Sequence, residues 1–304
     1  MSKKTLGHIL ALFTIIVWGT TFIASKTLLT TYSPAQTMLM RFVIAYIVLT
    51  VINHKYEKFN LKNEIRFILL ALSGNTLYFI CENVALTYTL ASNVSILLAL
   101  APMLTAILAH FLTKDEKLHK GIFIGFAIAI VGVGFVVFNG TVLLKLNPLG
   151  DLLSFGAAIM WAIYSILLKY SVNHFEGTYL TRKVSFYSIL TTIPIILFEN
   201  KGFPLQSIAE PKILISLLFL GIIGSGICYI AWNFSTKTLG IIATNNYIYL
   251  IPFITLISAG LLLKEPITLM GLLGAILIVG GIIISEKFSK MSRVDMLELL
   301  EENE

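Results

Sequence analysis

Long apolar segments alternate with short polar connections along the whole 304-residue chain. A helix needs about 20 mostly apolar residues to cross a bilayer, because its backbone amides must be satisfied inside hydrocarbon. No connection between the segments is long enough for a separate soluble domain. We therefore predict an all-α membrane protein with ten transmembrane helices, at 7–29, 34–53, 65–85, 91–112, 120–138, 149–171, 179–198, 211–233, 241–263 and 267–285.

The second half of the chain repeats the first half. One constant offset aligns 6–26 with 149–169, and later matches pair Arg41 with Arg182, Gly74 with Gly224, Asn83 with Asn233, and Pro102 with Pro252. Each copy holds an odd number of spans, so the second copy must enter the membrane the opposite way up. Two inverted five-helix repeats are typical of secondary transporters, whose substrate site lies near the midplane between the halves. A symmetric lipid-embedded scaffold is the alternative.

We expect the first repeat at 1–144, the second at 145–286 and a cytoplasmic tail at 287–304. The chain is 57% hydrophobic and 12% charged, against roughly 25% charged in a soluble domain. Most of its 22 Lys and Arg residues fall on the cytoplasmic side if the N-terminus is cytoplasmic. This excess predicts a multi-pass protein of the plasma membrane with both termini in the cytoplasm. The net charge of +6 therefore needs no nucleic-acid partner.

Short motifs recur in order in both copies. They are Trp18-Gly19-Thr20-Thr21-Phe22, Arg41-Phe42, Leu100-Ala101-Pro102 and Glu116 in the first copy, and Trp161, Arg182, Ile251-Pro252 and Lys264-Glu265-Pro266 in the second. Their order, spacing and duplication resemble the EamA branch of the drug/metabolite transporter superfamily over 7–286. The resemblance implies a ten-helix bundle with a central cavity that carries small metabolites. The second copy departs from the pattern at Trp161-Ala162, where the first has Trp-Gly.

Glu82 is the sharpest candidate for a substrate site. A polar residue inside a span is costly, so it marks a functional site by default. At 100° per residue, Asn75, Tyr78 and Glu82 share one face of the third span. The counterpart of Glu82 in the second copy is Trp232, so the acid breaks the repeat. It would neutralise a substrate ammonium group or carry a proton; alternatively it is hydrated near the outer interface or pairs with a basic side chain.

Other aromatic and polar side chains complete the candidate substrate-binding set. They are Trp18, Thr21, Trp161, Tyr164, Tyr229, Trp232, Asn245, Asn246 and Tyr249. The aromatic residues line a cavity or pack between helices, and the asparagines face a cavity or form interhelical hydrogen bonds. Arg41 contacts a substrate carboxylate or forms a structural ion pair. Pro102 and Pro252 lie inside predicted spans, where they mark hinges for alternating access or static kinks.

The function we predict is transport of a small polar metabolite, an amino acid or a related zwitterion or amine. Transport would be secondary-active or facilitative, by alternating access, and in the export direction. No HExxH, GxSxG or phosphate-binding glycine motif supports catalysis, and we expect neither a metal nor a cofactor. A lipid or lipid-precursor flippase or an intramembrane enzyme is the alternative. Protons are a candidate coupling ion, and both a monomer and a homodimer fit the sequence.

Overall fold

The computed structural model describes residues 1–54, 57–113, 120–138 and 148–262, and scattered positions between 269 and 284. Every regular element in this part of the chain is a helix. Seven helical stretches in it are long and apolar enough to cross a membrane: Lys3–Leu28, Pro34–Ile52, Leu61–Tyr88, Val94–Leu112, Pro148–Ser171, Pro211–Leu239 and Ile241–Leu262. The prediction of an all-α membrane protein is therefore confirmed.

The first copy contains the helices α1 to α7. They are α1 (Lys3–Leu28), α2 (Pro34–Ile52), α3 (Leu61–Ala71), the π-helix η1 (Leu72–Leu77), α4 (Tyr78–Tyr88), α5 (Ala91–Leu98), α6 (Ala101–Leu112) and α7 (Lys120–Phe138). A capping box starts α2, in which Ser33 and Gln36 bond to each other's backbone N–H groups and Pro34 takes the first turn.

The second copy begins with α8 and is described as far as α13. Its elements are α8 (Pro148–Ser171), α9 (Gly177–Glu199), the 3₁₀-helix η2 (Leu205–Ala209), α10 (Pro211–Leu218), the π-helix η3 (Phe219–Ile227), α11 (Cys228–Leu239), α12 (Ile241–Asn245), the 3₁₀-helix η4 (Asn246–Leu250) and α13 (Ile251–Leu262). The described positions between 269 and 284 are helical too. The predicted tail, 287–304, and the Glu116 and Lys264-Glu265-Pro266 motifs lie outside the described residues.

Three predicted spans are not among the seven apolar stretches. The helix α9 is 23 residues long, but it carries Arg182 and Lys183 near its start and many hydroxyl side chains. The helix α7 covers the predicted fifth span, and Phe123–Gly132 is the apolar stretch within it whose side chains the structure describes. The tenth span is described only in part. Within that part, Gly281 packs closely against Gly125 and Ala129 of α7 in the same chain.

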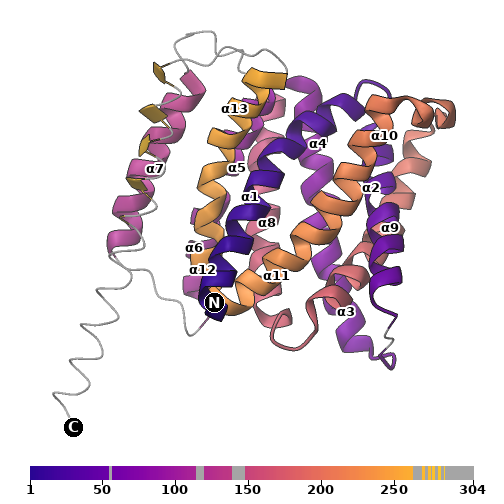
Figure 1. The fold of residues 1–304 in the computed structure, drawn as a ribbon, viewed down its shortest axis with the longest axis horizontal. Helices are drawn as coiled ribbons and strands as arrows, with labels where there is room; N and C mark the ends of the chain where they lie inside the picture. Colours follow the sequence, from indigo (N-terminus) through magenta and orange to yellow (C-terminus); the bar gives the residue numbers. More distant parts are fainter. Residues whose placement is uncertain are drawn as a thin grey trace.

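Helices of the two copies pack against each other in matching pairs. The helix α1 packs on α11, and α8, which matches α1, packs on α4. The helix α2 contacts both α9 and η3. In Figure 1 the chain ascends from α3 to α4 but descends from α10 to α11, although these two spans match in sequence. The fourth and ninth spans likewise run in opposite directions, from α5 down to α6 and from α12 up to α13.

A polar cluster joins the two copies at the end of the bundle where α3 begins. The ammonium nitrogen of Lys183 on α9 lies 2.7 Å from the carboxylate of Glu64 on α3. The hydroxyl of Tyr187 donates to the same carboxylate at 2.5 Å. At the opposite end, the hydroxyl of Tyr32 donates to the carbonyl of Pro204. The bundle is thus held together near both ends, with the largest aromatic side chains between them.

Candidate functional site

A cavity lies between the two copies, at the centre of the bundle. Its open volume is small, about 30 Å³, because the surrounding side chains fill most of the space between the walls. Its walls come from both halves of the chain. They consist of Trp18, Thr21, Phe22, Arg41, Tyr78, Phe79, Glu82, Leu98, Ala101, Trp161, Tyr229, Ile248 and Ile251.

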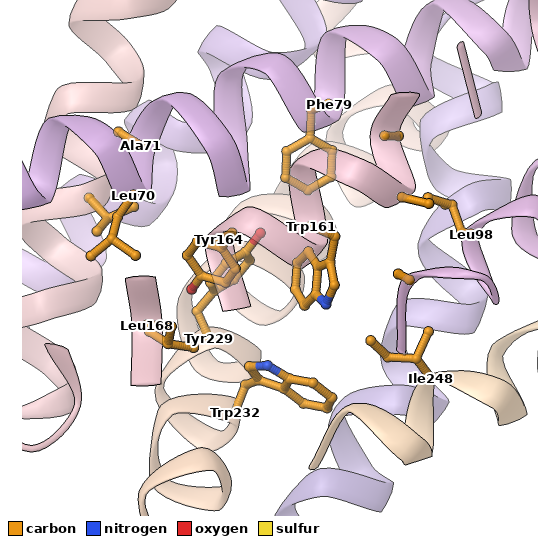
Figure 2. Close-up of a cluster of buried hydrophobic side chains, with 14 of the residues drawn as sticks. Leu70, Ala71, Phe79, Leu98, Trp161, Tyr164, Leu168, Tyr229, Trp232 and Ile248 are labelled. Atoms are coloured by element: carbon orange, nitrogen blue, oxygen red, sulfur yellow. The ribbon is translucent and has the colours of Figure 1, made fainter. Parts of the chain in front are cut away.

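Aromatic rings form most of one side of this cavity. The ring of Trp18 on α1 lies 5.2 Å from that of Trp161 on α8, at an interplanar angle of 87°. Tyr229 and Trp232 on α11 lie 5.4 Å and 5.0 Å from the Trp18 ring. Figure 2 shows Trp161 and Tyr164 of α8 converging with Tyr229 and Trp232 of α11. Edge-to-face contacts of this kind fix the orientation of each ring and so give the cavity a defined shape.

Hydrogen bonds hold three of these rings in place. The indole N–H of Trp18 donates to the carbonyl of Gly224 at 3.0 Å, and the hydroxyl of Tyr229 donates to the carbonyl of Gly74 at 3.3 Å. Both acceptors lie in π-helical turns, η3 and η1, and they occupy matching positions of the repeat. The indole of Trp161 donates to the Oδ1 atom of Asn245 at 3.0 Å. Each N–H or O–H group is thereby directed away from the cavity, and the face or edge of its ring lines the cavity wall.

Arg41 brings a positive charge into the cavity. Its side chain is buried, its Nε atom donates to the hydroxyl of Ser225 at 2.8 Å, and its guanidinium lies 4.0 Å from the centroid of the Phe79 ring. Its Nη1 atom has no hydrogen-bond partner among the described residues. A buried guanidinium with an unused donor is suited to accept a carboxylate, which guanidinium groups recognise with paired N–H donors.

Glu82 brings the opposite charge. Its carboxylate is 3% exposed, and it interacts electrostatically with the Tyr78 hydroxyl and the Arg41 guanidinium. Within the described part of the chain, no basic side chain forms an ion pair with it. The sequence alternative in which Glu82 and Arg41 neutralise each other in direct contact therefore does not describe this structure. The two charges face one cavity from α4 and α2 without closing it.

Seven of the thirteen predicted substrate-binding residues line this cavity: Trp18, Thr21, Arg41, Tyr78, Glu82, Trp161 and Tyr229. Asn75 does not, because its side-chain amide donates to the Ser188 hydroxyl on α9 at 2.8 Å. The predicted Asn75–Tyr78–Glu82 stripe assumed an unbroken α-helix, whereas Asn75 lies inside the π-helix η1. A π turn holds one more residue than an α turn, so positions before it rotate off the stripe.

The other predicted residues lie around the cavity. Tyr164 and Trp232 are buried among the aromatic rings behind its wall, and the indole N–H of Trp232 has no partner among the described residues. Asn245 bonds Trp161 and Ser165, so it supports the wall. Asn246 and Tyr249 line a separate pocket beside α6 and α7.

The two prolines break their spans on the N-terminal side. Pro102 lies in the first turn of α6, after the interruption at 99–100, and Pro252 is the second residue of α13, after the 3₁₀-helix η4. We expected both inside continuous helices. In the structure each proline instead starts a new helix, where its missing N–H costs nothing.

The family of the chain follows from its similarity to known proteins. A match to the EamA-like transporter family covers residues 5–138 and a second covers 148–286. The chain belongs to the EamA-like transporter family. The two matches correspond to the two copies of the repeat, so the resemblance found in the sequence motifs is confirmed.

Relatives of this EamA-like transporter share most of its length. The uncharacterized transporter YyaM of Bacillus subtilis is 29% identical over 282 residues, which cover 88% of this chain and 89% of that protein. An uncharacterized transporter of Archaeoglobus fulgidus is 28% identical over 290 residues, covering 93% and 97%. The relatives are transporters, and this protein is accordingly a membrane transporter for a small molecule and not an enzyme.

A solved crystal structure has the same fold as this EamA-like transporter. The two superpose with a TM-score of 0.71 at 18% sequence identity, over 94% of this chain and 99% of the other.

Among the described residues, no three His, Cys, Asp or Glu side chains come together as a metal site would require.

The sequence did not reveal the apolar part of the cavity wall of this EamA-like transporter. Phe22, Leu98, Ala101, Ile248 and Ile251 all lie in spans that are apolar throughout, so their composition does not mark the side that faces the cavity. Phe79 was also missed. Its place beside Tyr78, three residues before Glu82, was the one available signal.

Proposed function

We propose that this transporter moves a small zwitterion, an amino acid or a close relative, by alternating access. The observation that carries the proposal is the pair of buried opposite charges, Arg41 and Glu82, which line one cavity without forming an ion pair in the described structure. Buried charges that are not neutralised by an ion pair are expensive. A ligand that carries both a carboxylate and an ammonium group satisfies the two of them at once.

The aromatic wall supports the same class of ligand. Trp18, Trp161 and Tyr229 present ring surfaces rather than charges, so a ligand with several negative groups would find only one counter-charge, that of Arg41. Ring faces also attract ammonium groups. A compact molecule with one charge of each sign therefore fits the wall better than a polyanion.

Alternating access rests on the repeat. Matching spans run in opposite directions. The helix α1 packs on α11, and the matching helix α8 packs on α4, which matches α11, as expected for two inverted five-helix repeats. We propose ten transmembrane helices with both termini in the cytoplasm, the first repeat within 1–144 and the second within 145–286. The pocket walls would then open alternately to either side as the repeats exchange conformations.

We further propose export across the plasma membrane, with protons as the coupling ion. Glu82 supports the proton step because a buried carboxylate without an ion pair is suited to take up a proton when substrate leaves. The cavity is enclosed by residues of one chain, so a monomer suffices for transport.

A ligand screen tests the zwitterion proposal. Purified protein is heated with alanine, ethylamine or propionate, three molecules of similar size that carry both charges, only the positive charge or only the negative charge. A ligand that binds the folded state raises the melting temperature with its concentration, so weak millimolar binding is visible. We expect alanine or another amino acid to stabilise the protein more than either single-charge analogue. Equal stabilisation by ethylamine and alanine would refute the role of Arg41.

A further inference from the structure

Three buried side chains next to the cavity have polar atoms without a hydrogen-bond partner in the described structure. The hydroxyl oxygens of Ser25 and Thr37 and both amide atoms of Asn83 have no hydrogen-bond partner among the described residues. All three side chains are 0% exposed. Leaving a buried donor or acceptor unpaired costs about 1–3 kcal/mol, so such groups are rare. Their position on three different helices, each next to the cavity wall, is the observation on which the proposal below rests.

The three residues form one layer, which we call the outer layer. Each lies one helical turn from a residue of the cavity wall: Ser25 after Thr21 on α1, Thr37 before Arg41 on α2, and Asn83 after Phe79 on α4. Residues four apart share a helix face, so all three continue faces that line the cavity. Since α2 runs antiparallel to α1 and α4, the three steps lead toward the same end of the bundle (Figure 1).

Contacts in the wall fix this register. The guanidinium of Arg41 lies over the ring of Phe79, 4.0 Å from its centroid, which sets α2 beside α4 at this level. One turn further along two antiparallel helices, Thr37 must lie at the level of Asn83. The outer layer is therefore about 5.4 Å beyond the charges of Arg41 and Glu82, the rise of one turn.

The second copy shows what a structural asparagine looks like at this position. Asn233 matches Asn83, and its amide nitrogen donates to the hydroxyl of Thr181 at 3.0 Å, which ties α11 to α9, while its Oδ1 atom has no partner among the described residues. By the Arg41–Arg182 match, Met40 stands where Thr181 stands, so the first copy has no hydroxyl at that position of α2. The amide of Gln36, the residue before Thr37, is already bonded to Ser33 and Gly202. The packing role of Asn233 is thus absent in the first copy.

We propose that the outer layer binds the side chain of the transported zwitterion and selects substrates with a neutral polar side chain. This inference rests on the proposed function, in which Arg41 and Glu82 hold the carboxylate and the ammonium group. A side chain that extends one turn outward from these charges ends among two hydroxyls and an amide. An amide or hydroxyl there gains partners, whereas a methyl group leaves the layer unpaired. Sites of this kind reject the analogue that lacks the polar group.

Counterflow in proteoliposomes tests the proposal with two matched pairs of amino acids, threonine against valine and glutamine against methionine. Each pair has similar size and differs in the polar group. We expect the parent protein to prefer threonine and glutamine by about tenfold or more. The preference should fall to about threefold or less in Thr37→Val and in Asn83→Leu, since one hydrogen bond is worth about 0.5–1.5 kcal/mol.

Folding is controlled in two ways. Asn83→Leu removes an amide that has no partner in the described structure, so its melting temperature should equal or exceed that of the parent. A lower melting temperature would show that the amide has a structural partner and would overturn the proposal. Thr105→Val makes the same change as Thr37→Val at another side chain that is 0% exposed, whose hydroxyl donates to the Ala101 carbonyl. This variant should keep the parental preference.

The failures of the two proposals are distinguishable. Counterflow of threonine and valine at equal rates overturns the selectivity of the outer layer and leaves the zwitterion site intact. An unchanged preference in both folded variants does the same. Absence of counterflow for all four amino acids overturns the zwitterion proposal and this inference with it.

Discussion

Replacement of Glu82 by glutamine isolates the charge of the one acidic side chain in the cavity. The amide has nearly the same volume and keeps one acceptor oxygen, so the packing around Tyr78 should be retained. The carboxylate is 3% exposed, so water screens it poorly from a bound ammonium group. A hydrogen bond between charged partners is worth about 1.5–3 kcal/mol net. At 1.4 kcal/mol for each factor of ten, its loss should weaken zwitterion binding about tenfold to a hundredfold.

The measurement is zwitterion counterflow in proteoliposomes that contain equal amounts of folded protein, over a series of pH values. If Glu82 also carries the coupling proton, the pH dependence of the parent should flatten in Glu82→Gln. Glu210→Gln is the matched control, because Glu210 is exposed at the start of α10 and the chemical change is identical. Parental transport by Glu82→Gln at every pH would remove the carboxylate from the site and leave the neutral polar groups to bind the substrate.

Three further predictions concern topology and packing. Cysteines introduced at Ser2 and Asn200 should be labelled from opposite sides of the membrane, with Asn200 outside; labelling of both from the cytoplasm would refute the ten-helix arrangement. Gly74→Ala should lower the stability by about 1–3 kcal/mol, seen as a lower melting temperature, because the added methyl overlaps the Tyr164 ring; an unchanged melting curve would show that the ring moves freely. Trp232→Ala should cost about 3–5 kcal/mol because this 0%-exposed side chain is packed behind the cavity wall; loss of transport at parental stability would instead place it on the substrate path.

The membrane-spanning helices were predictable because hydropathy over about 20 residues is a local property of the chain. Glu82, Arg41 and Trp18 were predictable as well, since a charged or large aromatic residue inside a span is conspicuous wherever it points. The side to which a residue points was less predictable. Asn75 and Asn245 looked as suitable as Tyr78, but the structure directs them to Ser188 and Trp161.

The unpredicted features depend on departures from regular helices. No residue type announces a π turn, so the rotation of Asn75 away from Glu82 was invisible in the sequence. The breaks before Pro102 and Pro252 were indicated by the prolines, but their place at the start of a new helix was not. The apolar part of the wall carries no signal, because Leu98 and Ile248 resemble their lipid-facing neighbours in composition.

The π-helices η1 and η3 have a consequence for how the chain tolerates length changes. Each accommodates one extra residue without a loop, and everything after it in the span is rotated by about 100° relative to an unbroken α-helix. Deleting one residue from Leu72–Leu77 would let the span close into a regular α-helix and would keep Tyr78 and Glu82 facing Arg41, whereas a deletion in a regular α-helical part of the span would turn them away by about 100°. A one-residue gap at this place in a relative is therefore compatible with the same cavity lining, whereas a gap elsewhere in the span is not.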